Sequence, residues 1–288
     1  MKLEEIRMRD PFILKDIKSH KYYLYGTFKV DGTNDFYAYV SDDLIDFKGP
    51  FRIFKTPKDF WGTKDFWAPE VHEYHGKYYL IATFKGEKTN RACQIFVSDS
   101  PLGNFEVHSE IVTPLGRESL DGTLYIENDE PYLIFVHEWI QIKDGEVCAI
   151  KLSKDLKKMV GEPITLFKAS EASWSSQPYW AHFSYGVNIA DGPFIVKDEN
   201  GKVIILWSSY NDKEYVTGYA YNNSTSLFDA PFSQSKASLK ISDGGHGMIF
   251  DDFSGRKFLI VHVDNGLALE KPRLYKISVI DNKINILV

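Results

Sequence analysis

The sequence has 288 residues, of which 43% are hydrophobic and 26% charged, and this composition excludes a disordered or collagen-like chain. Its 34 Lys and Arg residues stand against 40 Asp and Glu residues, and the net charge of −6 without a basic run argues against a nucleic-acid partner. No apolar run approaches the ~20 residues of a membrane span, and the N-terminus has no apolar signal region. We therefore expect no membrane partner and a cytoplasmic protein, or a secreted one if a signal peptide was removed.

Five segments share one plan, which is a turn-forming residue, an apolar strand, a polar turn and a second apolar strand. The expected strand pairs are 9–14 with 21–25, 68–72 with 77–81, 121–126 with 131–135, 191–196 with 202–207, and 246–250 with 257–261. Turn pairs such as His75-Gly76 and Asn200-Gly201 suit short hairpins. A third strand is expected after four of the pairs, at 36–42, 94–99, 147–153 and 217–221.

The starts of these segments recur at a spacing of one four-stranded blade. Counted from Pro11, Pro69, Thr123, Pro193 and His246, the intervals are 58, 54, 70 and 53 residues. The repeat predicts an all-β, five-bladed propeller with four-stranded antiparallel blades, in which residues 1–288 form one domain. A β-sandwich would also explain short strands, but it would not explain the fivefold recurrence. The longest interval contains an aromatic insertion, 171–188, which we expect to be a loop over one end of the axis.

The first strand of each propeller blade lines the central channel, so the five segment starts should converge at one end of the axis. Asp10, Asp121 and Asp191 would then share one mouth with His246 and with Trp67. A single Asp beside Gly or Pro is explained as a turn former. Three at equivalent positions favour chemistry, because crowded like charges raise one another's pKa.

Cleavage of a glycosidic bond needs two carboxyl groups, one to protonate the leaving oxygen and one to activate water or to attack directly. Tryptophans supply flat apolar surfaces on which a sugar ring can stack. Trp67, Trp139, Trp174 and Trp180 are expected near the mouth, together with Phe66. The pattern therefore points to a carbohydrate site, with an oligosaccharide as the binding partner.

The segments 9–11, 67–70, 121–125, 191–194 and 245–247 resemble the blade-start motifs of glycoside hydrolase family 43, and the resemblance extends from residue 9 to residue 273. It implies an inverting, exo-acting glycosidase that removes terminal arabinofuranosyl, or else xylosyl or galactosyl, residues from plant-type oligosaccharides. By the same resemblance Asp10 is the general base and Asp121 modulates the pKa of the acid. His246 matches a histidine that ligates calcium or orders water on the axis, and Arg273 one that contacts the substrate or the acid. No organic cofactor is implied.

One position departs from the family pattern. The family's general acid is a Glu before Gly-Pro, whereas this chain has Asp191-Gly192-Pro193. Either the backbone brings the shorter Asp191 closer, or a nearby Glu is the acid, with Glu138 and Glu171 as candidates. Trp67, Trp139, Glu171 and Arg273 are the residues expected to bind substrate. The departure also leaves open a propeller that binds carbohydrate without cleaving it.

Overall fold

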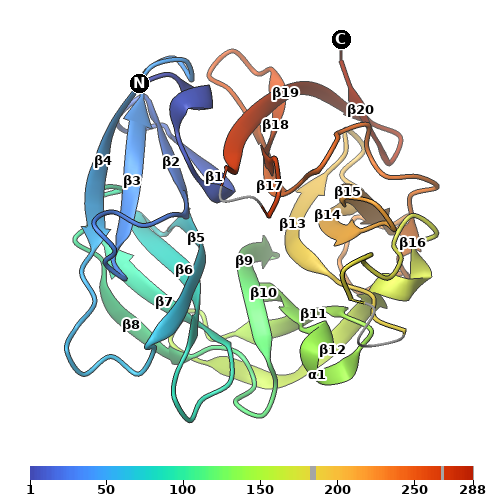
Figure 1. Ribbon diagram of the computed structural model, residues 1–288, viewed down its shortest axis with the longest axis horizontal. Coiled ribbons are helices and arrows are strands. Elements are labelled where there is room, and N and C mark those ends of the chain that lie inside the picture. Colours follow the sequence, from blue (N-terminus) through green and yellow to red (C-terminus); the bar gives the residue numbers. More distant parts are fainter. Residues whose placement is uncertain (182–185, 267–268, 288) are drawn as a thin grey trace.

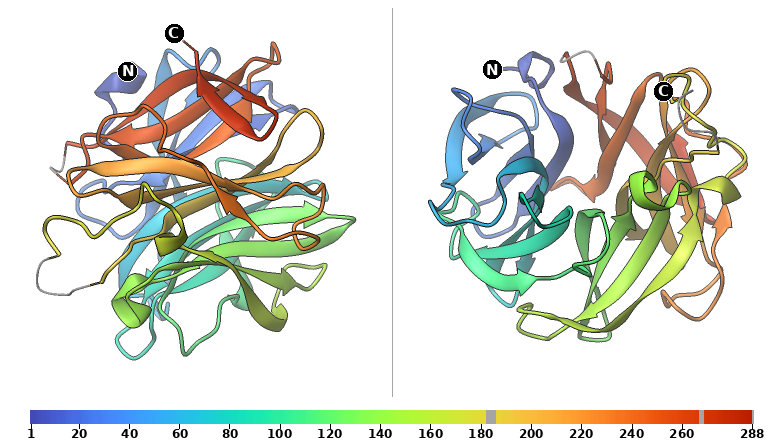
Figure 2. Two further views of the ribbon diagram at one scale, coloured as in Figure 1. Left: turned by 90° about the vertical axis from the view of Figure 1, so that its right-hand side faces the viewer. Right: turned by 60° about the horizontal axis from the view of Figure 1, so that its bottom comes forward.

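The computed structural model describes residues 1–181, 186–266 and 269–287, and their strands form five antiparallel sheets of four strands each. The sheets surround one axis as blades (Figure 1), and Figure 2 shows the same ring from two further sides. The predicted five-bladed propeller is confirmed.

Each blade consists of four strands that are consecutive in the sequence. Blade 1 contains β1 (Arg9–Asp16), β2 (Lys21–Thr27), β3 (Phe36–Ser41) and β4 (Phe47–Phe54), and blade 2 contains β5 (Lys64–Tyr74), β6 (Lys77–Lys85), β7 (Ala92–Ser98) and β8 (Glu106–Ile111). Blade 3 contains β9 (Ser119–Glu127), β10 (Glu130–His137), β11 (Glu146–Leu152) and β12 (Met159–Lys168). Blade 4 contains β13 (Asp191–Lys197), β14 (Val203–Tyr210), β15 (Tyr215–Tyr221) and β16 (Ser233–Gln234), and blade 5 contains β17 (Gly244–Asp251), β18 (Lys257–Val263), β19 (Lys271–Ile280) and β20 (Lys283–Ile286).

The described helices are short. They are the 3₁₀ helices η1 (Leu3–Glu5) and η2 (Ala169–Glu171) and the single-turn α1 (Trp139–Ile142). Among the residues that the structure describes, no helix is long and apolar enough to cross a membrane. The predicted loop 171–188 forms no named strand in its described parts, and residues 182–185 of it lie outside the described residues.

The innermost strand of every blade begins with a backbone irregularity. A residue with positive φ lies near each start, namely Asp10 (51°), Ala68 (45°), Asp121 (58°), Gly192 (51°) and His246 (45°). The pairing register with the neighbouring strand shifts at the same place in all five blades. Such β-bulges turn a side chain away from the regular alternation of a strand. They therefore aim the first residues of five separate strands toward the axis.

The ring closes between blades that come from opposite ends of the chain. The Met8 amide donates a hydrogen bond to the Glu270 carbonyl (3.0 Å), and the Arg7 guanidinium donates to the Leu269 carbonyl. Closer to the axis, the Asp10 amide donates to Nδ1 of His262 in β18 (3.2 Å). Side-chain and backbone contacts thus join blade 1 to blade 5, and one of them lies at Asp10.

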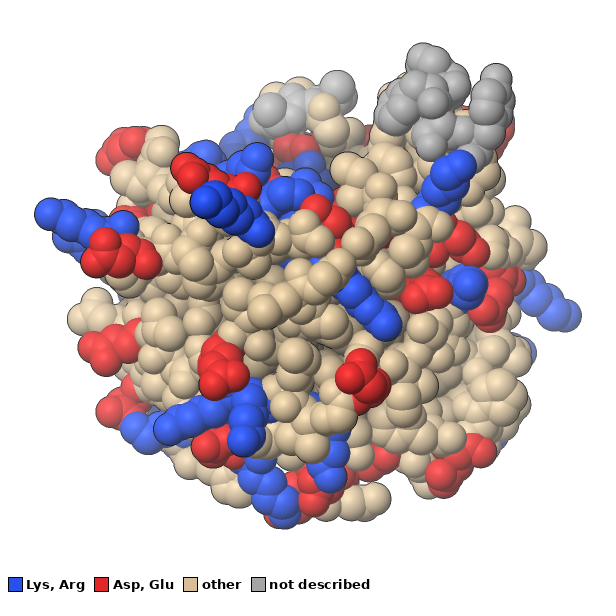
Figure 3. Space-filling model, turned by 90° about the horizontal axis from the view of Figure 1, so that it is seen from below, with Lys and Arg blue, Asp and Glu red and all other residues tan. Residues whose placement is uncertain are grey.

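The hydrophobic core lies between adjacent blades. The cluster shared by blades 2 and 3, for example, contains Tyr79 and Ile81 from β6 and Leu124 and Leu133 from β9 and β10. On the outside, the face seen in Figure 3 carries interspersed acidic and basic side chains, and no broad basic patch gathers on it. Apolar contact between blades is therefore the main force that holds the axis residues in place.

Replacing Leu133 with Ala should lower the free energy of unfolding by about 2 to 5 kcal/mol, because the side chain is fully buried and its loss leaves a cavity between blades 2 and 3. Leu115→Ala is the matched control, since Leu115 is 62% exposed, and it should change stability by less than about 0.5 kcal/mol. Urea unfolding monitored by tryptophan fluorescence measures both. Equal effects of the two substitutions would contradict the packing described here.

Candidate active site

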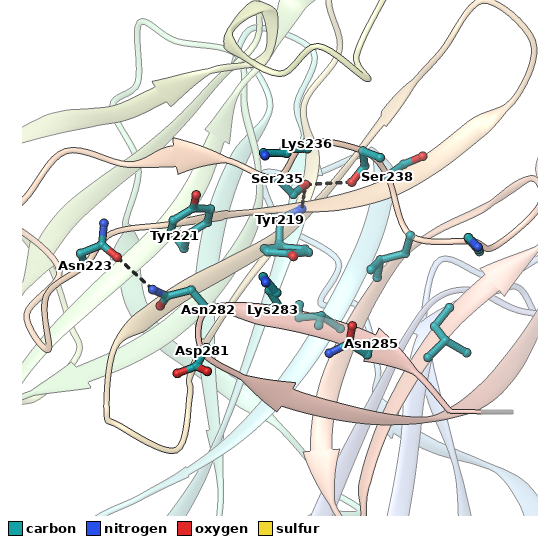
Figure 4. A pocket seen from close by; sticks show the side chains of 15 residues that line it. Tyr219, Tyr221, Asn223, Ser235, Lys236, Ser238, Asp281, Asn282, Lys283 and Asn285 are labelled. Atoms are coloured by element: carbon teal, nitrogen blue, oxygen red, sulfur yellow. Dashed lines mark hydrogen bonds between the residues drawn. The ribbon is translucent and has the colours of Figure 1, made fainter.

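One cavity of about 260 Å³ lies where the innermost strands begin. It is lined by Arg9, Asp10, Thr27, Trp67, Leu120, Asp121, Glu138, Trp139, Trp180, Ile189, Asp191, Tyr210 and His246. The structure thus brings together four carboxyl groups, the axial histidine and three tryptophans. A larger cavity of about 770 Å³ lies between the outer parts of blades 4 and 5 (Figure 4), but Asp281 is the only carboxylate in its lining, so it does not offer paired carboxyl groups.

His246 connects the two aspartates that the sequence predicts as base and modulator. Its Nδ1 lies 3.2 Å from Oδ1 of Asp10 and 3.7 Å from Oδ2 of Asp121. Its backbone amide donates to the Ser208 hydroxyl (2.8 Å), which fixes the bulge from which the ring projects. The imidazole therefore offers a hydrogen-bond partner to two carboxylates that would otherwise only repel each other.

Asp10 is buried but keeps a low pKa. Burial raises the pKa of this carboxyl, yet the charges of His246, Arg9 and His262 outweigh that effect and hold the pKa below its ordinary value. Oδ1 is buried, and the Nδ1 atoms of His246 and His262 lie 3.2 and 3.6 Å from it. The lowered pKa means that Asp10 is ionised at neutral pH, as a base must be.

Asp121 and Asp191 show the opposite shift. Burial, followed by the charge of Asp10, raises the pKa of Asp121 well above its ordinary value, although the Gly192 amide donates to its Oδ2 (3.1 Å). Burial and the charge of Asp121 raise the pKa of Asp191 in the same way. The Tyr215 hydroxyl donates to Oδ2 of Asp191 (3.2 Å). Burial and mutual repulsion therefore make both carboxyl groups of this pair weaker acids than Asp10.

Glu138 lies at the start of α1 and is held by a guanidinium group. Nη1 of Arg91 donates to Oε2 of Glu138 (2.7 Å), while Nε of Arg91 donates to Asp65 (2.9 Å). The same guanidinium lies over the ring of Trp67, 4.9 Å from its centroid. Burial raises the pKa of Glu138 and outweighs the opposing charge of Arg91. One residue thus positions both a carboxyl group with a raised pKa and an aromatic wall of the cavity.

Aromatic side chains form the side of the cavity near blades 3 and 4. Trp139 and Trp180 meet at a centroid distance of 6.1 Å, and Trp180 meets the Tyr210 ring edge-on at 5.4 Å. Trp174, expected at the mouth, instead packs on Trp207 inside blade 4 (4.4 Å). Three tryptophans, Trp67, Trp139 and Trp180, therefore remain for contact with a sugar ring.

Two residues predicted to bind substrate, Glu171 and Arg273, are not among the residues that line this cavity. Glu171 is exposed in η2, after the outermost strand of blade 3, and accepts a hydrogen bond from the Lys168 amide (3.0 Å). Arg273 is exposed in β19, the third strand of blade 5, and lines a separate surface cavity with Leu44 and Ile45. Neither lies on an innermost strand, and Glu171 therefore does not compete for the role of general acid.

The side chains around His246 supply few of the oxygen ligands that the calcium ion implied by the family resemblance would need. Among the described residues, no group of three or more His, Cys, Asp or Glu side chains is arranged to hold a metal ion. Calcium prefers six to eight oxygen ligands, whereas the imidazole of His246 itself faces the two carboxylates. Calcium binding stays a prediction, and the chemistry below has no step that uses it.

Sequence reasoning missed the residues that act behind the cavity wall. His262 accepts the Asp10 amide on Nδ1, and its Nε2 lies 3.1 Å from the Asn265 side-chain oxygen. Asn265 in turn donates to the hydroxyl of Tyr210 (2.7 Å). Arg91 lies between β6 and β7, away from any blade start. No repeat signal marks these positions, because each lies on a different part of its blade.

A buried cluster of carboxyl groups with divergent pKa values, enclosed by tryptophans at the end of a propeller axis, is the site of a glycoside hydrolase. The family model for glycosyl hydrolases family 43 matches residues 4–277, and the chain belongs to this family.

Known relatives differ in the linkage named for them. A crystal structure of an endo-arabinase from Bacteroides thetaiotaomicron VPI-5482 is 40% identical, covers 98% of each chain and has a TM-score of 0.89. An endo-1,4-beta-xylanase structure from the same organism is 22% identical over 98% of this chain and 95% of that one, with a TM-score of 0.77, and shows the fold alone. An extracellular exo-alpha-(1->5)-L-arabinofuranosidase of Streptomyces avermitilis is 28% identical over 158 residues, 53% of this chain and only 31% of that protein.

His262 should make the stability of the protein depend on pH. Burial lowers the pKa of His262 to about 4, whereas an unfolded histidine has a pKa of about 6.5. Between about pH 4 and pH 6.5 the unfolded chain binds more protons than the folded chain, so the free energy of unfolding rises with pH. The contribution of neutral His262 to stability is therefore lost as the pH falls from about 6.5 toward 4. At about 1.4 kcal/mol per pKa unit, this contribution is roughly 3 kcal/mol.

His262→Asn should therefore flatten the pH dependence of the free energy of unfolding in that window, as measured by urea titration. His75→Asn is the control, because the His75 side chain is 63% exposed. It should leave the slope unchanged. An unaltered slope in His262→Asn would show that His262 is not held neutral by burial.

Proposed function

We propose that the protein is an inverting, exo-acting glycosidase that releases terminal α-L-arabinofuranosyl residues from oligosaccharides. The observation that carries the proposal is the divergence of carboxyl pKa values around one cavity: Asp10 is ionised, while burial raises the pKa of Asp121, Asp191 and Glu138. Paired titratable groups whose environments separate their pKa values are the mark of an acid and a base.

In the proposed reaction a water molecule held by the Asp10 carboxylate attacks the anomeric carbon while its proton passes to Asp10. The bond from that carbon to the glycosidic oxygen breaks, and a proton from Glu138 neutralises the leaving oxygen. Attack from the side opposite the leaving group inverts the anomeric configuration. Asp121 acts through its effect on the pKa values of its neighbours, because it lies next to Asp10 across His246.

Glu138 suits the role of acid better than Asp191. The charges of His246 and Arg9 lower the pKa of Asp10 and also oppose the rise in the pKa of Asp191. Asp191 therefore shares its charged neighbours with the base. Glu138 instead interacts with Arg91, on the Trp67 side. Arg91 donates to Oε2 and can stabilise the carboxylate that forms when the proton leaves. The shorter side chain at Asp191 fits this division.

The size of the cavity supports exo action. Its volume of about 260 Å³ lies below the ~300 to 1,000 Å³ that is typical of ligand pockets, which favours a single terminal sugar. The arabinose preference is supported by the names of the endo-arabinase and the arabinofuranosidase to which the chain is similar. The 40% identity to the endo-arabinase favours a second candidate, which is endo cleavage of the same polymer.

Products formed from a linear α-(1→5)-arabino-oligosaccharide should distinguish these functions. Exo action with inversion gives monomeric arabinose from the first turnover, and proton NMR should show its β anomer before mutarotation. Early release of oligosaccharides without monomer would favour the endo candidate. If no arabinoside, xyloside or galactoside is cleaved but sugars bind, the protein is a carbohydrate-binding propeller.

Substitution of the carboxyl groups should separate their roles. Asp10→Asn should lower kcat/KM by about 10² to 10⁴ on all substrates, because the base is lost. Glu138→Gln should cause a similar loss on oligosaccharides but a much smaller one on a dinitrophenyl arabinofuranoside, whose leaving group needs no proton. Asp191→Asn should show no such dependence on the leaving group. If Asp191→Asn shows it and Glu138→Gln does not, Asp191 is the acid.

A further inference from the structure

The cavity of about 770 Å³ between the outer parts of blades 4 and 5, called the blade 4–5 cavity here, lies apart from the catalytic cavity (Figure 4). Among the described residues, none lines both cavities. One wall consists of residues 235–240, which follow β16, and the other of residues 281–286, which include β20. Tyr219 and Tyr221 of β15 also line it. The protein thus has a second concave surface at the outer edge of the ring.

The short outermost strand of blade 4 leaves room for this cavity. β16 has 2 residues, whereas the outermost strands of blades 1, 2 and 3 have 8, 6 and 10. After β16, the Ser235 amide donates to the Tyr219 carbonyl (2.8 Å) and the Leu239 amide to the Thr217 carbonyl (2.7 Å). Because this segment has more residues between these two hydrogen bonds than β15 has, residues 236–238 loop away from the sheet. Backbone hydrogen bonds therefore fix both ends of this wall.

Asn282 joins the two walls and has an acceptor atom without a partner. Its side-chain Nδ2 donates to Oδ1 of Asn223 (3.0 Å), which connects blade 5 to blade 4 (Figure 4). The residue is only 8% exposed, and its Oδ1 has no hydrogen-bond partner among the described residues. A buried acceptor without a partner costs free energy. A hydroxyl group bound in the cavity would supply the missing donor.

The charged side chains of the lining are mostly basic. Three of them are exposed lysines without an ion-pair partner among the described residues, namely Lys236, Lys240 and Lys283. Asp281 is the one acidic residue of the lining. Asp198 and Glu199 accept backbone amides of the 281–282 turn (3.2 and 3.0 Å) and do not line the cavity. The lining thus has more positive than negative groups, in a protein whose net charge is −6.

A uronic acid unit combines the groups that this lining can bind. Its carboxylate suits the lysines, its hydroxyl groups are donors for Oδ1 of Asn282, and its apolar ring face suits the partly exposed Tyr221. A fully ionised inorganic anion has no donor for Asn282. A neutral sugar would leave the three ammonium groups without a charged partner.

We propose that the blade 4–5 cavity binds an acidic polysaccharide, whose chain contains uronic acid units. The site would hold the enzyme on such a polymer without directing a chain into the catalytic cavity, since the two cavities share no lining residue among those described. The inference goes beyond the proposed exo-glycosidase function and does not depend on it.

Calorimetric titration with a short α-(1→4)-linked oligogalacturonate and with its methyl ester tests the site, because the ester keeps the sugar rings and loses the charges. The wild-type protein should bind the oligogalacturonate more tightly than the ester. A variant with both Lys236→Ala and Lys283→Ala should bind the oligogalacturonate about five- to tenfold more weakly and the ester almost as before. Both lysines are exposed, so this variant should fold.

A variant with both Lys55→Ala and Lys58→Ala is the matched control. Both residues are exposed and outside the blade 4–5 cavity and the catalytic cavity, and the change in net charge is the same. Its affinity for the oligogalacturonate should equal that of the wild-type protein. Both double variants should hydrolyse nitrophenyl α-L-arabinofuranoside at the wild-type rate, because none of the four lysines lines the catalytic cavity.

The outcomes separate this site from the proposed activity. Equal affinities of the wild-type protein for the acid and the ester, or an unchanged affinity in the Lys236 and Lys283 variant, would overturn the site. So would an equal loss in the Lys55 and Lys58 variant, which would assign the effect to net charge. Binding of poly-L-glutamate as tight as that of the oligogalacturonate would show that anions bind without recognition of a sugar. A wild-type protein that binds the oligogalacturonate as expected but cleaves no arabinoside would overturn the proposed function alone.

Discussion

The contact of His246 with Asp10 and Asp121 is the constraint around which the rest of the site is arranged. A propeller brings the first residues of its innermost strands to one axis, and in this chain three of these residues are aspartates. Buried like charges at such a distance are unfavourable. The imidazole at 3.2 and 3.7 Å gives both carboxylates a partner, and the remaining repulsion raises the pKa values of Asp121 and Asp191. The fold therefore brings these carboxyl groups together, and their burial and mutual repulsion separate the pKa of Asp10 from those of Asp121 and Asp191.

The closure of the ring is part of the same arrangement. Blades 1 and 5 meet where the Asp10 amide donates to His262, which is fully buried and stacks on the ring of Tyr215. Tyr215 in turn donates to Asp191. A neutral His262 is required, because Nδ1 must accept a hydrogen bond, and burial lowers its pKa accordingly. The joint between the chain ends thus also orients the base and its neighbouring carboxyl group.

The sequence predicted the fold and the axis residues because both depend on the repeat. Each bulge residue lies next to a Pro, Gly or Thr that marks a blade start, so Asp10, Asp121 and Asp191 could be placed without coordinates. The sequence could not place Arg273 and Glu171 in the same way. A position along the chain indicates the blade to which a residue belongs, but it gives neither the distance of the residue from the axis nor its exposure. Arg91 could not be found either, since its importance comes from contacts with two other segments.

The geometry of the site gives a physical reason for the Asp at position 191. The Asp191 carboxyl group accepts a hydrogen bond from Tyr215, and burial together with the charge of Asp121 raises its pKa. The proposed acid can then come from Glu138, whose Oε2 accepts a hydrogen bond from Arg91. The same guanidinium lies over the ring of Trp67, so it links that carboxyl group to an aromatic wall of the cavity. Under this arrangement the positions of the proposed acid and of one candidate sugar-stacking surface depend on a single arginine.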